Sequence, residues 1–273
     1  MSISFINALS VSVTVVLIKT SHSGNIGAVA RAMKNMGLCK LRLVEPKNFP
    51  SDEATRRSSG AENILNSAEV FGSMDEAIND CHFVVGASAR SRSLAWPLFN
   101  PRECATKVLS LIASQSALVV NGTEQLAEPV RKVALVFGQE ASGLTNEELQ
   151  RCNYHVNIPA NPEYASLNLA MAVQVIAYEL RMAALLEEES DLLSGTECAG
   201  AEEWEGELAS VGEVEGLLQH TEATAIKLGF LNPAKPGMLM PRLRRLYQRA
   251  ALDKMEVNIL RGILKATLNQ IGK

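Results

Sequence analysis

Short apolar runs alternate with amphipathic stretches over the first two thirds of the chain. VTVVLIKT (13–20) and VALVFG (133–138) have the length and β-branched content of buried strands. Further predicted strands are residues 41–46, 81–88, 116–122 and 154–159. Apolar residues three and four apart predict helices over residues 25–37, 62–68, 74–80, 102–114, 146–151 and 164–187. This alternation predicts an α/β fold, with a mostly parallel sheet covered by helices on both faces.

The last part of the chain has a purely helical pattern. Residues 194–217 are rich in Gly, Ser, Ala and Glu, which is typical of a solvated linker that passes into a helix. Two amphipathic helices follow within residues 236–270. We expect the first to pack through Leu239, Leu243, Leu246 and Ala250, and the second through Val257, Leu260, Ile263, Leu264 and Leu268.

Charge divides the chain into three parts. Residues 1–181 are neutral, residues 182–226 carry 12 acids and no Lys or Arg, and residues 227–273 carry 10 bases and 2 acids. We therefore expect a main α/β domain over 1–187, an acidic linker over 188–216 and a small, basic, all-α C-terminal domain over 217–273.

Composition narrows the class of protein. Apolar residues make up 47% of the chain, and its first segment lacks a basic start and a cleavage site, so we expect neither a signal peptide nor a membrane span. Five cysteines without a CxxC pair favour reduced thiols and a cytoplasmic location. The four histidines are scattered as well, and we expect no metal site.

The predicted helix at 25–37 carries two candidate functional residues. Its apolar face centres on Ile26, Val29 and Met33, and Arg31 lies about 150° from that centre. Arg31 is thus either a solvated side chain or a group that meets a ligand. Asn25 stands at the helix start, where Asn commonly caps backbone N–H groups. The segment lacks GxGxxG and GxxxxGK[ST], which disfavours a nucleotide-dependent oxidoreductase and an ATPase.

Two further polar groups flank buried elements. Gly138 and Gly143 surround Glu140 directly after a predicted strand, and glycines let a ligand approach the backbone closely. Ser166 and Asn168 precede an apolar helix that its own domain or a partner subunit must bury. Each of these polar residues has a purely structural alternative, as a turn former or a helix cap. Polar residues at strand ends nevertheless favour a ligand site, because open parallel sheets bind ligands there.

Three segments carry a family resemblance: TSHSGNIGAVARAMKNMGL (20–38), FGQEASGLTNEEL (137–149) and IPANPEYASLNLAMAVQVIAYELR (158–181). Together they resemble the three motifs of the SPOUT methyltransferases of the TrmH class. With GASARSRSLAWPLFNPREC (86–104) and MEVNILRGIL (255–264), the resemblance spans nearly the whole chain. It points to members that methylate the ribose 2′-oxygen of cytidine or uridine 32 in the tRNA anticodon loop.

The resemblance implies a SPOUT-type parallel sheet with a C-terminal trefoil knot, bound S-adenosylmethionine, and a homodimer whose active site borrows residues across the interface. The implied catalytic set is Asn25, Arg31, Glu140, Ser166 and Asn168. The implied cofactor contacts are Ala87, Ser88, Ala89, Gly138, Ile158, Ala165, Ser166 and Leu167. The glycine turn and NPEYASLN would then form two walls of one cofactor pocket.

RNA contacts are expected from arginines. Arg90 and Arg92 match the family, and Arg242, Arg244, Arg245 and Arg249 cluster beside an apolar stripe, where the alternative is a solvated helix face. The chain departs from the family at Gln139, where Arg is usual, and residues 105–130 are longer than usual. Arg31 is either a proton acceptor or a phosphate anchor, and a guanidinium carries no acceptor. An RNA-binding protein without catalysis and a ribosomal RNA 2′-O-methyltransferase remain alternatives.

Overall fold

The structure is a computed structural model that describes residues 5–88, 98–113, 131–194 and 207–271. Its centre is a seven-stranded sheet in the order β3-β2-β1-β6-β4-β7-β5, and every described strand pair is parallel. The strands are β1 Val13–Ile18, β2 Lys40–Val44, β3 Glu69–Phe71, β4 Phe83–Ala87, β5 Leu98–Phe99, β6 Val133–Phe137 and β7 Tyr154–Val156. The predicted parallel α/β sheet is confirmed, and the strand predicted at 116–122 lies outside the described residues.

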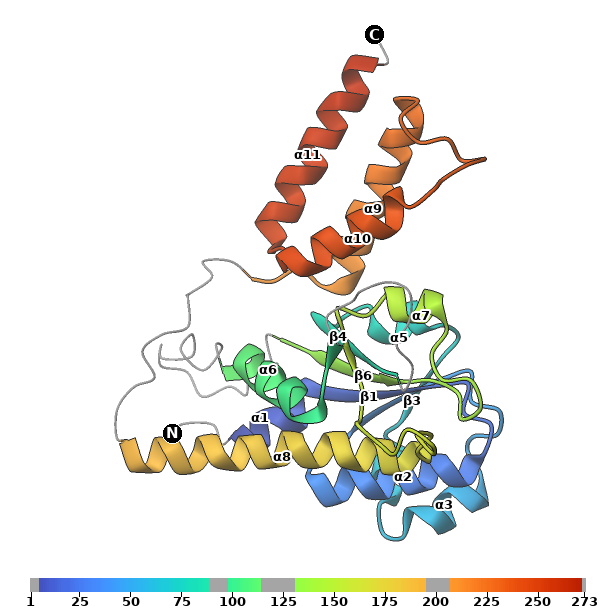
Figure 1. Cartoon of the computed structure of the whole chain (residues 1–273), viewed down its shortest axis with the longest axis vertical. Coiled ribbons are helices and arrows are strands. Elements are labelled where there is room, and N and C mark those ends of the chain that lie inside the picture. The colour runs from blue at the N-terminus through green and yellow to red at the C-terminus, as the bar shows by residue number, and fades with distance from the viewer. Residues whose placement is uncertain (1–4, 89–97, 114–130, 195–206, 272–273) are drawn as a thin grey trace.

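Helices cover both faces of the sheet, as Figure 1 shows. Val13, Val15 and Leu17 of β1 point into one core, and Val16 and Ile18 point into the other. The first core is closed by α1 Phe5–Ser12, α2 Ser23–Met36, α3 Asp52–Ser58, α4 Glu62–Asn66, α6 Pro101–Ala113 and α8 Leu169–Ser194. The second is closed by α5 Met74–Ile78 and α7 Asn146–Gln150. Burial on both faces explains why β1 and β6 are continuous apolar runs.

Helix boundaries follow local capping. Helix α2 ends at Gly37, whose φ of 82° is the left-handed conformation expected of a stop residue. Helix α8 begins at Leu169 and not at 164, because Asn168 Oδ1 accepts the Ala170 N–H at 2.9 Å and starts the helix there. The sequence pattern did not predict α1, α3, β3 or β5.

Helix α8 contains a stretch, Leu169–Glu189, that is long and apolar enough to cross a membrane by length and composition alone. Its residues Val173, Ile176 and Leu180 are buried against the first core. Packing inside the protein therefore accounts for one face of this stretch, while Met171 and Tyr178 on the other face stay exposed.

The C-terminal helices form a small separate core. They are α9 Val211–Lys227, α10 Leu239–Ala250 and α11 Lys254–Ile271, and Leu217 and Val257 are buried between them. Three expected contacts are wrong: Leu246 is 45% exposed, Ile263 is 58% exposed, and Ala250 is exposed as well. Tyr247 packs against this core instead. Helix α8 continues to Ser194 and α9 starts at Val211, so both helices enter the range expected as linker.

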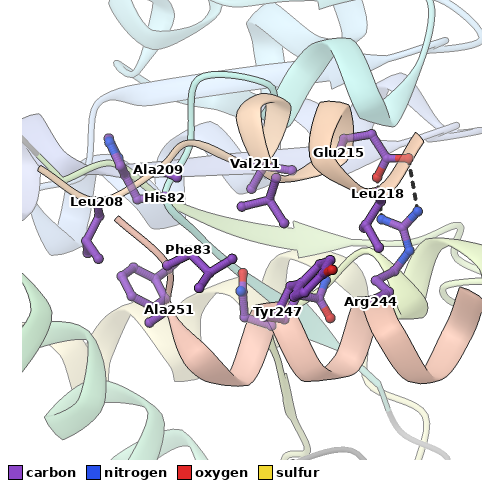
Figure 2. A pocket seen from close by; sticks show the side chains of 14 residues that line it. His82, Phe83, Leu208, Ala209, Val211, Glu215, Leu218, Arg244, Tyr247 and Ala251 are labelled. Atoms are coloured by element: carbon purple, nitrogen blue, oxygen red, sulfur yellow. Dashed lines mark hydrogen bonds and ion pairs between the residues drawn. The ribbon is translucent and has the colours of Figure 1, made fainter. Parts of the chain in front are cut away.

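This helical module is docked on the face of the sheet that carries α5 and α7 (Figure 1). Val211 N–H donates to Cys81 O at 2.8 Å, and Gly212 N–H donates to Asn79 O at 3.1 Å. Within the module, Figure 2 shows Arg244 of α10 directed at Glu215 of α9, close to this contact with the sheet. The cavity there, about 30 Å³, has room for water but not for a cofactor.

Candidate active site

Glu140 lies in the turn that follows β6, beside the loop that follows β1. Because β1 and β6 are adjacent parallel strands, their carboxyl ends bring the two segments together. The Glu140 carboxylate accepts the Ser21 N–H at 3.1 Å, the Ser21 hydroxyl at 3.0 Å and the His22 N–H at 3.3 Å. It also accepts Asn25 Nδ2 at 3.0 Å. The turn after β6 is thereby tied to the start of α2.

These contacts decide the charge of Glu140. Burial by itself would raise the pKa of its carboxyl group. Hydrogen bonds from the Asn25 side chain and from the backbone N–H groups of Ser21 and His22 outweigh burial and lower the pKa to about 2. Glu140 is therefore an anion at neutral pH and acts as a hydrogen-bond acceptor, not as a proton donor.

A second amide extends this arrangement to the third motif. Asn168 Nδ2 donates to Asn25 Oδ1 at 3.2 Å, and Asn168 Oδ1 caps α8. Asn168, Asn25 and Glu140 thus form one hydrogen-bonded chain, which we call the Asn–Asn–Glu chain. It joins the segment before α8, the first turn of α2 and the turn after β6. The side chains of Asn25 and Asn168 therefore connect these segments by hydrogen bonds. Asn168 also caps α8, which was the structural alternative that the sequence analysis gave for it.

A cavity of about 270 Å³ lies at the same edge of the sheet. All the expected cofactor contacts within the described residues line it, and Ala89 lies outside those residues. The lining residues from that prediction are Ala87, Ser88, Gly138, Ile158, Ala165, Ser166 and Leu167. Glu140 and Gln139 line it as well. The structure therefore gathers the glycine turn and the NPEYASLN segment around one hollow.

The walls of the cavity require small residues. A Cβ placed on Gly138 would stand 2.2 Å from the backbone carbon of Gly143, so any larger residue would displace the turn. Gly143 itself has φ +68°, and its N–H donates to Gln139 O at 2.8 Å. On the far wall, Ser88 N–H donates to Val156 O at 2.9 Å, which fixes the end of β4 against β7. The departure at Gln139 falls on the rim of this cavity.

Arg31 stands apart from the Asn–Asn–Glu chain. Its side chain is exposed on α2 and forms no hydrogen bond or ion pair with any described residue. By helical geometry it projects roughly 120° away from Asn25 around the helix axis. The structure of one protomer thus joins four of the five expected catalytic residues, Asn25, Glu140, Ser166 and Asn168, around the cavity or beside it, and leaves Arg31 facing outward.

The expected RNA-binding arginines divide into three groups. Arg90 and Arg92 lie outside the described residues. Arg242, Arg245 and Arg249 are exposed on α10. Arg244 turns inward and forms a two-point ion pair with Glu215, with Nη2 and Oε1 3.0 Å apart. Arg244 therefore has a structural contact inside the helical module, between α10 and α9.

Sequence reasoning missed Ser21 and His22, which hold the Glu140 carboxylate through backbone N–H groups. A polar Ser-His-Ser stretch directly after an apolar strand was the available signal. Among residues 5–88, 98–113, 131–194 and 207–271, no cluster of three His, Cys, Asp or Glu side chains could hold a metal ion. The polar groups at the site are amides, hydroxyls, one carboxylate and backbone groups.

Comparison with known proteins agrees with this geometry. The SpoU rRNA Methylase family profile matches residues 12–178, and the profile of the tRNA methyltransferase TrmJ C-terminal domain matches residues 212–273. The chain is 50% identical over 259 residues to the tRNA (cytidine/uridine/adenosine-2'-O-)-methyltransferase TrmJ of Pseudomonas aeruginosa, covering 93% of each protein. It is 46% identical over 263 residues to the tRNA (cytidine/uridine-2'-O-)-methyltransferase TrmJ of Citrobacter koseri, covering 96% of this chain and 98% of that protein.

A solved structure of a TrmJ protein has a similar fold. The crystal structure of TrmJ from Z. mobilis superposes with a TM-score of 0.72 at 29% identity, covering 93% of this chain and 97% of that chain. The match includes the helical module as well as the sheet, because it covers 93% of this chain. The resemblance drawn from the three motifs is confirmed: the chain belongs to the SpoU methylase family and, within it, to the TrmJ group.

Proposed function

We propose that the protein is an S-adenosylmethionine-dependent tRNA 2′-O-ribose methyltransferase that acts on cytidine or uridine at position 32 of the anticodon loop. The observation that carries this proposal is the cavity at the strand ends, with the Asn–Asn–Glu chain beside it. Its TrmJ relatives carry tRNA 2′-O-methyltransferase names, which supports the substrate class. A cytoplasmic site of action follows from a tRNA substrate.

The cavity suits S-adenosylmethionine. Its walls combine apolar side chains, including Ile158 and Leu167, with backbone groups that small residues leave accessible. Gly138 would have no room for a Cβ, so the turn 138–144 keeps a fixed, close-fitting shape. The cofactor supplies an electrophilic methyl group, and a 2′-oxygen that displaces it needs no metal ion.

The chain's own residues would align the ribose and the cofactor pocket. Glu140 is held by four donors and in turn holds Asn25, which fixes the start of α2 against the glycine turn. Asn168 fixes the start of α8 to the same point. Such preorganisation of reacting groups is a large part of catalysis in a displacement reaction. With a pKa of about 2, Glu140 is a weak acceptor for the hydroxyl proton at neutral pH.

Arg31 would act on the RNA and not on the pocket of its own protomer. A guanidinium donates hydrogen bonds in a fork that fits a phosphate, and it carries no acceptor for a proton. We assign Arg31 the role of holding a phosphate next to the target ribose and orienting the 2′-hydroxyl. Its outward direction from α2 supports this role.

A homodimer would complete the site. The outer face of α8 keeps Met171 60% exposed and Tyr178 49% exposed, beside residues that line the cavity. A second copy packed on this face would bury these apolar side chains and could bring its Arg31 to the cavity of the first. The trefoil knot that the family implies would lie in the same region, between β7 and α8.

The exposed arginines of α10 would bind tRNA outside the site. Arg242, Arg245 and Arg249 form a basic surface on the helical module, and phosphates bind such surfaces with strong salt dependence. Arg244 would instead hold α10 to α9 through Glu215. A ribose in a single-stranded loop is accessible without opening a duplex.

One assay tests the proposal. The protein is incubated with labelled S-adenosylmethionine and with separate tRNA and ribosomal RNA pools, and the methylated nucleotide is mapped by nuclease digestion and mass spectrometry. We expect label in tRNA at position 32 as a 2′-O-methyl pyrimidine. Label in ribosomal RNA alone would reassign the substrate, and no transfer with intact RNA binding would indicate a non-catalytic binding protein. An Arg31→Lys variant with normal turnover would contradict the role given to Arg31.

A further inference from the structure

Helix α3 packs against α2 at two glycines, and Arg57 lies along that contact. The Cβ of Arg57 is 2.9 Å from the point where a Cβ on Gly27 would stand, and its Nε is 3.5 Å from the corresponding point on Gly24. The Arg57 side chain therefore runs over α2 from Gly27 toward Gly24. This direction leads to the start of α2, where Asn25 and His22 meet Glu140.

Arg31 lies on the same side of α2 as Arg57, and we call these two residues the arginine ridge. Arg31 follows Gly27 by one helical turn, and residues four apart on a helix share a face. Because side chains of a helix lean toward its N-terminus, the Arg31 side chain extends back toward Gly27 and the stem of Arg57. Along this face of α2, the Arg57 guanidinium thus lies between Arg31 and the start of the helix.

The positive charge of this ridge is not neutralised within the described residues. Arg31 and Arg57 are both exposed, and neither forms a hydrogen bond or ion pair with any residue that the structure describes. The carboxylate of Glu53 also lies over Gly24: its Oε1 is 2.7 Å from the point where a Cβ on Gly24 would stand, and its Oε2 accepts the Ser23 hydroxyl at 3.2 Å. One engaged carboxylate beside two guanidinium groups leaves a local excess of positive charge, which an anion would relieve.

We infer that Arg57 is a second phosphate-binding residue, which acts with Arg31 on the RNA backbone next to the target ribose. This inference rests on the proposed function. A pair of guanidinium forks can hold one phosphate, or two successive phosphates, more firmly than a single arginine. The ligand is the RNA substrate, because the ridge leads to the Asn–Asn–Glu chain and not to the helical module.

Helix α3 offers a matched control. Ala54 and Ser58 face α2 and are buried, and Arg56 lies on the opposite side of α3. Arg56 carries the same charge, is exposed, and is adjacent to Arg57 in the sequence. Removing either arginine changes the net charge equally, so a difference between the two variants reports position and not overall charge.

The test measures binding of an unmodified tRNA transcript to Arg57→Met and Arg56→Met between 50 and 200 mM salt. Methionine keeps the apolar stem over Gly27. We expect Arg57→Met to weaken binding by about tenfold and to reduce the salt slope of log K by about one, since one phosphate contact is lost. Arg56→Met should change the affinity less than about twofold, and affinity for S-adenosylmethionine should stay the same in both.

Two more measurements sharpen the result. Arg57→Lys keeps the charge but loses the fork, and should recover only part of the affinity. In an Arg31→Lys background, Arg57→Met should cost less than it does alone if both side chains hold the same phosphate. If Arg57→Met binds tRNA with the wild-type affinity and salt slope while the parent protein methylates tRNA normally, this inference is overturned and the proposed function stands. A parent protein that transfers no methyl group to tRNA would overturn the proposed function and this inference with it.

Discussion

The side-chain amide of Asn25 donates to Oε1 of Glu140 at 3.0 Å, although the two residues are 115 positions apart in the sequence. The contact exists because β1 and β6 are neighbouring parallel strands that end at the same edge of the sheet. Ligands of open α/β sheets bind at this edge. Changes to these two residues should therefore affect the geometry of the site more than the stability of the fold.

Replacing Asn25 by Asp would place a carboxylate against Glu140. We expect single-turnover methyl transfer at neutral pH to fall by about a hundredfold, because like charges at hydrogen-bond distance repel and raise one another's pKa. Activity should recover partly as the pH is lowered, since a shared proton restores the hydrogen bond. Asn25→Ala should be impaired without that recovery, and identical pH profiles for the two variants would contradict the prediction.

Glu140→Gln should change the response of the protein to acid. The folded protein lowers the pKa of Glu140 from 4.5 to about 2, so its ionised form contributes stability that is complete above pH 4.5. That contribution is lost as the pH falls from about 4.5 to about 2. The difference between wild-type and variant urea midpoints should thus be constant near neutral pH and shrink in that acidic window. A difference between the midpoints that stayed constant throughout that acidic window would contradict the prediction.

Gly138→Ala should damage the cofactor pocket. The added methyl group would meet backbone atoms of Gly143 and Leu144 at 2.2 and 2.3 Å, and backbone atoms cannot rotate away. We expect binding of S-adenosylmethionine, measured by calorimetry, to weaken by at least about tenfold. Gly262→Ala is the control, because a Cβ there meets nothing within 4 Å. It should leave binding intact and raise stability by roughly 0.5–1 kcal/mol, as an added alanine in a helix does. Unchanged binding in Gly138→Ala would show that the turn can shift freely.

Gly212→Ala should loosen the helical module. A Cβ at Gly212 would stand 2.2 Å from Asn79 Oδ1 and 3.2 Å from Asn79 O, at the point where α9 is hydrogen-bonded to the end of α5. Hydrogen exchange at the start of α9 should accelerate, and tRNA affinity should fall while cofactor affinity stays the same. At Gly216, one turn further along α9, a Cβ would meet only Arg261 Nη1 at 3.9 Å, an ordinary contact, so Gly216→Ala should show neither effect. Equal exchange rates in the two variants would refute this account of the docking.

The elements that local pattern could predict are those whose neighbours are near in sequence. The apolar run of β1 reflects burial on both faces of the sheet, and the end of α2 at Gly37 reflects a left-handed backbone conformation. Both were predicted correctly. The packing face of α10 was not predicted correctly, because its contacts with α9 and α7 partly bury Tyr247 and leave Leu246 exposed. A periodic pattern with two adjacent apolar positions cannot decide between them.

The candidate active site shows more clearly what a local sequence pattern cannot predict. Residue types alone left Asn25 and Asn168 as possible helix caps, and only the family resemblance assigned them to a site. The hydrogen bonds that join them depend on strand order, which no local pattern encodes. The hydrogen bond from Ser21 to Glu140 was missed for the same reason, since the two residues become neighbours only when β1 and β6 pair.

The helical module and the arginine ridge lie on opposite sides of the sheet, the former with α5 and α7 and the latter on α2 and α3. An RNA that touched both on a single copy would have to wrap around the edge of the sheet. In the proposed homodimer a more direct path runs over two copies: the helical module of one copy would bind the body of the tRNA, and the arginine ridge of the other would meet the anticodon loop. An anticodon hairpin lacks the body of the tRNA, so it should lose the contacts with the helical module and keep those with the arginine ridge. Shortened substrates would therefore show which copy makes which contact.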